Sequence, residues 1–169
     1  SYDDYAGGGE PGVVFEADFT GAWQGEIPFG WGVTAATSLN WYAENINGAG
    51  GIAPEMVFDW SPSFTGISRL ITPEIDASAF GNLELTFKQL VDNSSGLFYL
   101  KVQVSTDDGS TWADAWSIYP TYINDIGPET VAVDLSAYDG QTFKLAWVFD
   151  GYSYDIDYWQ IDDILVTGN

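Results

Sequence analysis

The sequence predicts an all-β fold, an antiparallel β-sandwich formed by a single domain. Apolar and polar residues alternate along several short segments, which is the pattern of half-buried strands. An aromatic share of 17% and 19 glycines favour strands joined by Gly-rich turns. A length of 169 residues suits one hydrophobic core. We therefore expect residues 13–169 to form one sandwich with long Gly- and aromatic-rich loops.

The expected strands follow one another at regular spacing. They cover residues 13–19, 37–45, 56–60, 68–71, 83–91, 98–105, 131–135, 143–149 and 158–166. Alternation is clearest in three of them, where one face carries Leu83, Leu85, Phe87 and Val91, then Phe98, Leu100, Val102 and Val104, then Phe143, Leu145, Trp147 and Phe149. A turn near 136–139 is the only helical feature that we expect.

The last strand contains two adjacent acids, Asp162 and Asp163, within an apolar run. Strict alternation would place Trp159, Ile161 and Leu165 on one face and Ile164 and Val166 on the other. Neighbouring charges in a buried strand are costly unless a cation or backbone donors neutralise them. The strand is therefore either a hard-metal site or a surface edge.

Residues 1–12, SYDDYAGGGEPG, read as a flexible or assembly arm. Its Tyr2 and Tyr5 are candidate contacts, either with the arm's own domain or with a neighbouring chain. Adding a strand to the sheet edge of a neighbour is one way in which such an arm assembles subunits.

The charge excludes several classes of partner. There are 25 acidic and 4 basic residues, a net charge of −21, so the chain cannot replace the counterions of a nucleic acid, and an anionic membrane is disfavoured. No apolar run is long enough to insert into a membrane. Without His there is no Ser-His arrangement, and no G-x-S-x-G elbow is present, so we do not expect an enzyme.

Residues 105–112, STDDGSTW, resemble the Asp-box, a hairpin motif of secreted β proteins. Asp107 is expected to bond the backbone amides of the turn, Gly109 to take a positive φ, and Trp112 to pack beneath the turn. This motif stabilises a fold and argues against a catalytic role.

A larger set of motifs occurs in a recognisable order. They are Phe15-Glu16, Pro28 with Gly30-Trp31, Trp41, residues 70–73 (LITP), the Asp-box, residues 133–136 (VDLS) with Gly140, and residues 159–163 (WQIDD). Together they resemble the MAM-like jelly-roll group, in particular the cleaved-adhesin and choice-of-anchor domains of secreted bacterial surface proteins. The resemblance covers residues 13–167 and implies a non-catalytic extracellular jelly-roll module.

The resemblance also implies structural Ca²⁺ between the first and last strands. Carried over residue by residue, it assigns Glu16 and Asp18 on the first strand and Asp162 and Asp163 on the last. Carboxylate oxygens suit Ca²⁺, and no His or Cys is present to favour zinc. The alternative is that these acids pair with backbone donors or solvent.

Two aromatic groups are candidate ligand-binding surfaces. One combines Tyr152 and Tyr154 with Asp155 and Asp157, and the other contains Trp116, Tyr119 and Tyr122. Rings stack on sugar faces and acids accept hydroxyl protons, so both groups suit glycans. The alternatives are that the rings cover the ends of the sandwich or pack against another subunit.

From these features we expect a secreted or cell-surface protein, since the chain begins at Ser1 without Met, as a processed chain does. The expected function is adhesion or self-assembly, with copies of itself or other cell-surface proteins as partners and calcium as a structural cofactor. The alternative is a carbohydrate-binding module that recognises glycans through surface Trp and Tyr.

Overall fold

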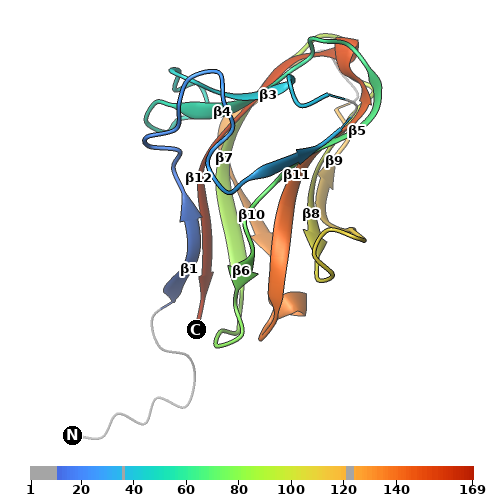
Figure 1. Cartoon of the computed structure of the whole chain (residues 1–169). Coiled ribbons are helices and arrows are strands. Elements are labelled where there is room, and N and C mark those ends of the chain that lie inside the picture. Colours follow the sequence, from blue (N-terminus) through green and yellow to red (C-terminus); the bar gives the residue numbers. More distant parts are fainter. Residues whose placement is uncertain (1–10, 36, 121–123) are drawn as a thin grey trace, which may run out of the picture.

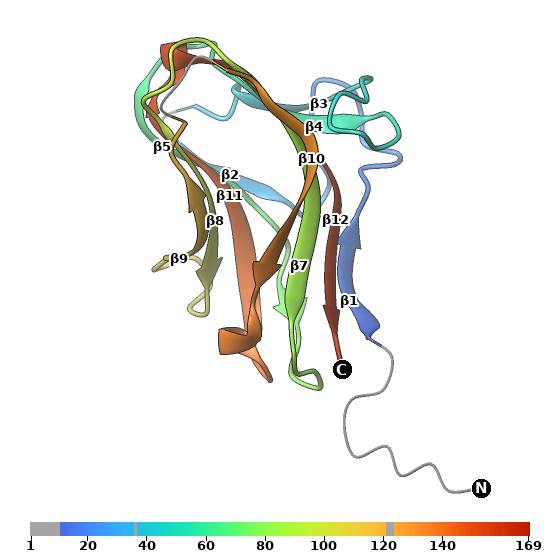
Figure 2. The ribbon, with the colours of Figure 1, turned by 180° about the vertical axis from the view of Figure 1, so that it is seen from behind.

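The chain folds into two antiparallel β-sheets that pack face to face (Figures 1 and 2). The structure is a computed structural model and describes residues 11–35, 37–120 and 124–169. Sheet A has the order β10 (Ile126–Asp134), β7 (Glu84–Asn93), β12 (Ile156–Gly168), β4 (Glu55–Asp59) and β3 (Trp41–Glu44), and β1 (Gly12–Ala17) also pairs with β12. Sheet B has the order β2 (Gly32–Thr34), β5 (Thr65–Ile71), β11 (Thr142–Tyr152), β8 (Tyr99–Ser105) and β9 (Ala113–Ile118), with β6 (Ile75–Asp76) paired to β11. The predicted all-β sandwich is confirmed.

Strand β12 organises sheet A. One of its edges pairs with β7, while the other pairs first with β4, through Tyr158–Ile161, and then with β1, through 164–168. In Figure 1 β1 and β12 lie side by side and antiparallel, with β12 running down to the C-terminus, and the β11–β12 connection lies at the opposite end of the sandwich. That connection contains the short 3-10 helix Ser153–Asp155; a second one spans Ser136–Tyr138.

The core lies between the sheets and is rich in aromatic side chains. The alternating faces predicted for β7, β8 and β11 are all buried. Trp41, Trp147 and Trp159 are fully buried, and the rings of Phe58 and Phe149 stack across the sandwich with centroids 4.6 Å apart. Burial of this many large rings is a major source of the fold's stability.

The predicted faces of the last strand are wrong beyond Asp162. The register of β12 against β7 shifts between Asp162 and Leu165, and Asp163 has a φ of 48°, which marks a β-bulge. The bulge adds one residue, so Ile164 joins Trp159 and Ile161 in the core and Leu165 turns outward. Strict alternation fails here because a period of two does not survive an inserted residue.

Other strand boundaries were also missed. The strands expected from the sequence do not include β2, β6 or β9, and β10 begins at Ile126, earlier than expected. The predicted arm, including Tyr2 and Tyr5, lies almost wholly outside the described residues. No helix in the described part of the chain is long and apolar enough to span a membrane.

Candidate functional site

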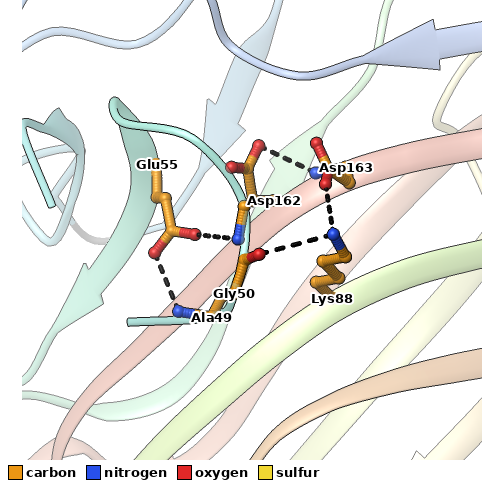
Figure 3. Close-up of polar contacts among 7 residues, drawn as sticks. Ala49, Gly50, Glu55, Lys88, Asp162 and Asp163 are labelled. Carbon is orange, nitrogen blue, oxygen red and sulfur yellow. Dashed lines mark hydrogen bonds and ion pairs between the residues drawn. The ribbon is translucent and has the colours of Figure 1, made fainter. Parts of the chain in front are cut away.

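A pair of buried carboxylates, Glu55 and Asp162, lies on the outward side of sheet A. Glu55 begins β4 and Asp162 lies on the neighbouring strand β12, and neither side chain is exposed. The Gly-rich loop before β4 covers them: the amides of Ala49 and Gly51 donate to Glu55 Oε1 and Oε2 at 2.9 and 3.3 Å (Figure 3). The sequence analysis did not identify Glu55 as a site residue. The Gly50-Gly51 pair shortly before it is the one feature of the sequence that marks a tight loop at this place.

Asp162 is the less satisfied member of the pair. Its Oδ1 accepts the amide of Asp163 at 2.8 Å, whereas its buried Oδ2 accepts no hydrogen bond from an N–H or hydroxyl donor of the described residues and lies near the carboxyl group of Glu55. Burial, together with the nearby charges of Asp163 and Glu55, raises the pKa of Asp162 to about 7. Burial also raises the pKa of Glu55. The ion pairs among the described residues include neither of these two carboxylates.

The loop can lie this close because Gly51 has no side chain. A Cβ at Gly51 would overlap Oδ2 of Asp162, and one at Gly48 would overlap Oε1 of Gln160. Both glycines are thus required by close backbone approach to β12. The result is a lid of backbone over two polar side chains.

Asp163 lies on the other side of the bulge, beside Lys88. The ammonium of Lys88 is 2.8 Å from Asp163 Oδ2 and also donates to the carbonyl of Gly50 at 3.4 Å (Figure 3). Asp163 and Lys88 line an open groove of about 620 Å³, together with Glu16 and Asp18 of the first strand region. Three of the four predicted metal ligands therefore share this groove, while Asp162 faces Glu55.

The two remaining candidates are exposed. Glu16 lies on β1 opposite Leu165 of β12. Asp18 Oδ1 accepts a hydrogen bond from the amide of Thr20 at 2.9 Å. This hydrogen bond holds the pKa of Asp18 below its usual value. Asp18 thus closes its own turn.

Oxygen ligands for Ca²⁺ are present, but the described side chains do not form a complete set. Among residues 11–35, 37–120 and 124–169, no three Asp, Glu, His or Cys side chains gather closely enough to hold a metal ion. Glu55 and the unpartnered oxygen of Asp162 fit a calcium ion in kind, and backbone carbonyls would have to complete its shell. The predicted set of Glu16, Asp18, Asp162 and Asp163 stays a prediction.

The first aromatic group lies at the end of the sandwich opposite to the C-terminus. Tyr152 and Tyr154 are exposed, 57% in the case of Tyr154, and their rings lie 6.0 Å apart at 27°. The rings of Trp60 and Tyr154 meet nearly at right angles, with their centroids 5.3 Å apart. These rings are held in place without being covered.

The two acids of this group have different surroundings. Asp155 accepts the hydroxyl of Ser95 at 2.8 Å. Asp157 lies near three other acids, Asp92, Asp125 and Asp59. Loss of hydration raises the pKa of Asp157 most, and a hydrogen bond with Asp92 raises it further. Asp155 therefore ties two loops together, whereas Asp157 belongs to an acidic surface.

The second aromatic group does not stay together. The rings of Trp116 and Phe87 meet nearly at right angles with their centroids 5.5 Å apart, and Trp116 packs at the margin of the core. Tyr119 is exposed, and the centroid of its ring lies 4.6 Å from that of Tyr99. Tyr99 was not among the residues expected in this group. Tyr122 lies outside the described residues.

The Asp-box has the expected geometry. Asp107 Oδ1 accepts the amide of Thr111 at 2.8 Å, Gly109 has a φ of 86°, and Trp112 lies beneath Gly109. Hydrogen bonds from the side chain and then the amide of Thr111 lower the pKa of Asp107 to about 2.

Comparison with known proteins shows a likeness of fold alone. No family model and no curated protein matches the sequence. One similar solved structure is the K2 cleaved adhesin domain of Lys-gingipain, with a TM-score of 0.68 and 18% identity over 92% of this chain and 98% of that one. Another is the K1 cleaved adhesin domain of Lys-gingipain from Porphyromonas gingivalis W83, with a TM-score of 0.67 and 20% identity over 94% of this chain and 99% of that one.

A carbohydrate-binding module is also similar. TmCBM61, solved with β-1,4-galactotriose, has a TM-score of 0.56 and 15% identity, over 82% of this chain and 88% of that one. At these identities the likeness concerns the fold, an adhesin-like β-sandwich.

Proposed function

We propose that this chain is a non-catalytic adhesion module, carried outside the cell, that recognises glycans through exposed aromatic rings. The observation that carries the proposal is the pair Tyr152 and Tyr154, whose rings stay exposed while contacting each other. Exposed, fixed rings offer a sugar stacking surface at little entropic cost. The absence of His from the sequence and the likeness to adhesin and carbohydrate-binding folds support a binding role over a catalytic one.

The test is a glycan array probed with the whole protein and with a Tyr152→Ala/Tyr154→Ala double variant. The double variant should lose most of the signal on every glycan that these two rings contact. Trp23→Ala removes another exposed ring, in the loop between β1 and β2, and serves as the matched control. A wild-type protein that binds no glycan would overturn the proposal.

We also propose that a structural Ca²⁺ ion is held at Glu55 and Asp162, beside the groove of Glu16, Asp18 and Asp163. What supports it is the unpartnered, buried Oδ2 of Asp162 opposite a second buried carboxylate. A divalent cation would neutralise both charges, and oxygen ligands suit calcium.

The calcium proposal is tested by thermal unfolding in EDTA and in millimolar Ca²⁺. Calcium should raise the Tm of the wild type. Asp162→Asn removes a charge without changing shape, so it should raise the Tm in EDTA and abolish the response to Ca²⁺. Glu74→Gln, at an exposed acid, should keep the response. Equal Tm values of the wild type in both buffers would contradict the proposal.

Self-assembly is a second candidate function, favoured by the position of β1. Among the described strands β1 pairs with β12 alone, Val13 is exposed, and residues 1–10 lead directly into this edge strand. An edge strand offers unpaired backbone to a neighbour. Deleting residues 1–10 should abolish any assembly seen by light scattering while leaving Tm unchanged; assemblies that persist would exclude this role for the arm.

A further inference from the structure

The outward face of sheet B carries three of the chain's four basic residues. Core side chains alternate with outward ones along β11, β8 and β5, which places Lys144, Lys101 and Arg69 on the same outer face. The chain has 25 acidic and only 4 basic residues, so this face differs in charge from the rest of the surface.

Five of the polar side chains on this face form a connected strip. Arg69 Nε donates to Gln103 Oε1 at 2.7 Å, and Gln103 Nε2 donates to Asp114 Oδ1 at 2.8 Å. Lys101 Nζ lies 3.2 Å from Asp114 Oδ2 and 3.8 Å from Asp150 Oδ2. We call Arg69, Lys101, Gln103, Asp114 and Asp150 the polar strip. Its two cations balance its two carboxylates, so the strip is locally neutral.

Aromatic rings flank the polar strip at both cations. The guanidinium carbon of Arg69 lies 5.5 Å from the ring centre of Trp112, and Lys101 Nζ lies 5.1 Å from that of Tyr99. Tyr119 extends the second ring surface beside Tyr99. Trp112 thus has a second contact beyond its Asp-box turn.

Few aliphatic side chains are exposed on this face. Ala146 and Val148, the apolar residues of β11 on this face, are fully buried beneath the polar side chains. Ile67, which is opposite Asp150 on β5, is exposed, and the rest of the accessible surface around the strip is ionic and aromatic. Such a mixture matches a sugar, whose hydroxyls both donate and accept and whose ring faces stack on aromatics.

Charge selects among sugars. A uronic-acid chain would meet a protein of net charge −21 and a strip whose cations are already paired. A neutral glycan meets no such repulsion. It can use the donors of Arg69 and Lys101 and the acceptors of Asp114 and Asp150 together.

We propose that the polar strip and its flanking rings, Trp112, Tyr99 and Tyr119, bind the chain of a neutral glycan. This inference rests on the proposed function and specifies its binding face and its class of ligand. Tyr152 follows Asp150 by two residues on β11, and its ring lies beside that of Tyr154 in the short helix that comes next.

The test is affinity electrophoresis of the whole protein through gels that contain galactan, xylan or β-glucan, with polygalacturonate as the anionic comparison. Tyr99→Ala and Arg69→Met should each weaken binding to the neutral glycan about tenfold, the loss of one stacking or ionic contact. Tyr99→Phe keeps the ring and should bind as the wild type does. Trp23→Ala is the control for an unrelated exposed ring, and equal Tm values show that the variants are folded.

Each outcome bears on one of the two proposals. Loss in Tyr99→Ala and Arg69→Met, with binding kept in Tyr99→Phe and Trp23→Ala, supports the strip. Binding that survives both strip variants but is lost in the Tyr152→Ala/Tyr154→Ala protein overturns the strip and leaves the proposed function standing. Retardation by polygalacturonate alone overturns the neutral class of ligand. No retardation in any gel overturns the strip, and the glycan array then decides the function.

Discussion

Gly51 lies directly against the carboxylate of Asp162, with no room for a Cβ between the loop and strand β12. The relationship links a glycine of a surface loop to a buried acid on the longest strand of sheet A. It explains why two acidic side chains can be buried outside the hydrophobic core. The loop's backbone covers them, and its amides bond Glu55.

Gly51→Ala should therefore destabilise the fold, because the new methyl group must displace either the loop or Asp162. Gly32→Ala is the matched control, since nothing lies within 4 Å of a Cβ at Gly32. Thermal unfolding followed by circular dichroism should show a clear fall in Tm for the first variant and none for the second. Equal Tm values would mean that the loop is free to lift from β12.

Trp116→Ala should act on stability, because Trp116 packs on Phe87 at the margin of the core. We expect a loss of about 3 kcal/mol in the free energy of unfolding, the low end for a large aromatic side chain removed from a core. Tyr119→Ala, at an exposed ring, should cost far less. Urea denaturation of both variants makes the comparison, and the reverse order would contradict the packing described.

Asp107 should make the stability of the Asp-box turn depend on acid pH. Its pKa is lowered to about 2 in the folded chain, from an ordinary value of 3.8, so its contribution is present above pH 4 and is lost as pH falls toward 2. The difference in Tm between the wild type and Asp107→Asn should therefore be largest near neutral pH and shrink toward pH 2. A difference that stays constant over this range would rule out the ionised turn.

Lys88→Met should have little effect on stability, although it breaks the ion pair with Asp163. Both side chains are about one-third exposed, at 35% and 36%, and ion pairs of this kind contribute little. Unfolding midpoints in 0.1 M and 1 M NaCl are the measurement. A large fall in the Tm of Lys88→Met that is the same at both salt concentrations would contradict this expectation. It would show that the Lys88–Asp163 pair behaves as a buried ion pair.

The sandwich could be predicted because burial in β7, β8 and β11 follows strict alternation, which a sequence displays directly. The last strand could not, since a bulge depends on how β12 meets β7 and β1, and neither contact is visible within the strand. The adjacent acids Asp162 and Asp163 did signal an unusual place in the fold. Their different surroundings follow from the bulge.

The candidate sites were predictable only where their residues are close in sequence. Tyr152 and Tyr154 were found because one loop carries both. Glu55 was missed because its pairing with Asp162 arises from the β4–β12 register. Arg69, Gln103 and Asp114 were missed for the same reason, because they lie on three different strands and meet only across sheet B.

The bulge in β12 also decides where this protein can change length. Ile161 and Ile164 both face the core although they are three positions apart, because Asp163 is the extra residue between the two parts of the strand. Removing Asp163 would leave a regular strand in which a period of two still points Ile164 and Val166 inward and Leu165 outward. The deletion would remove the ion pair with Lys88 but leave the interior sequence unchanged. Homologous chains should therefore differ in length by one residue at this point while keeping the same apolar residues on the core face.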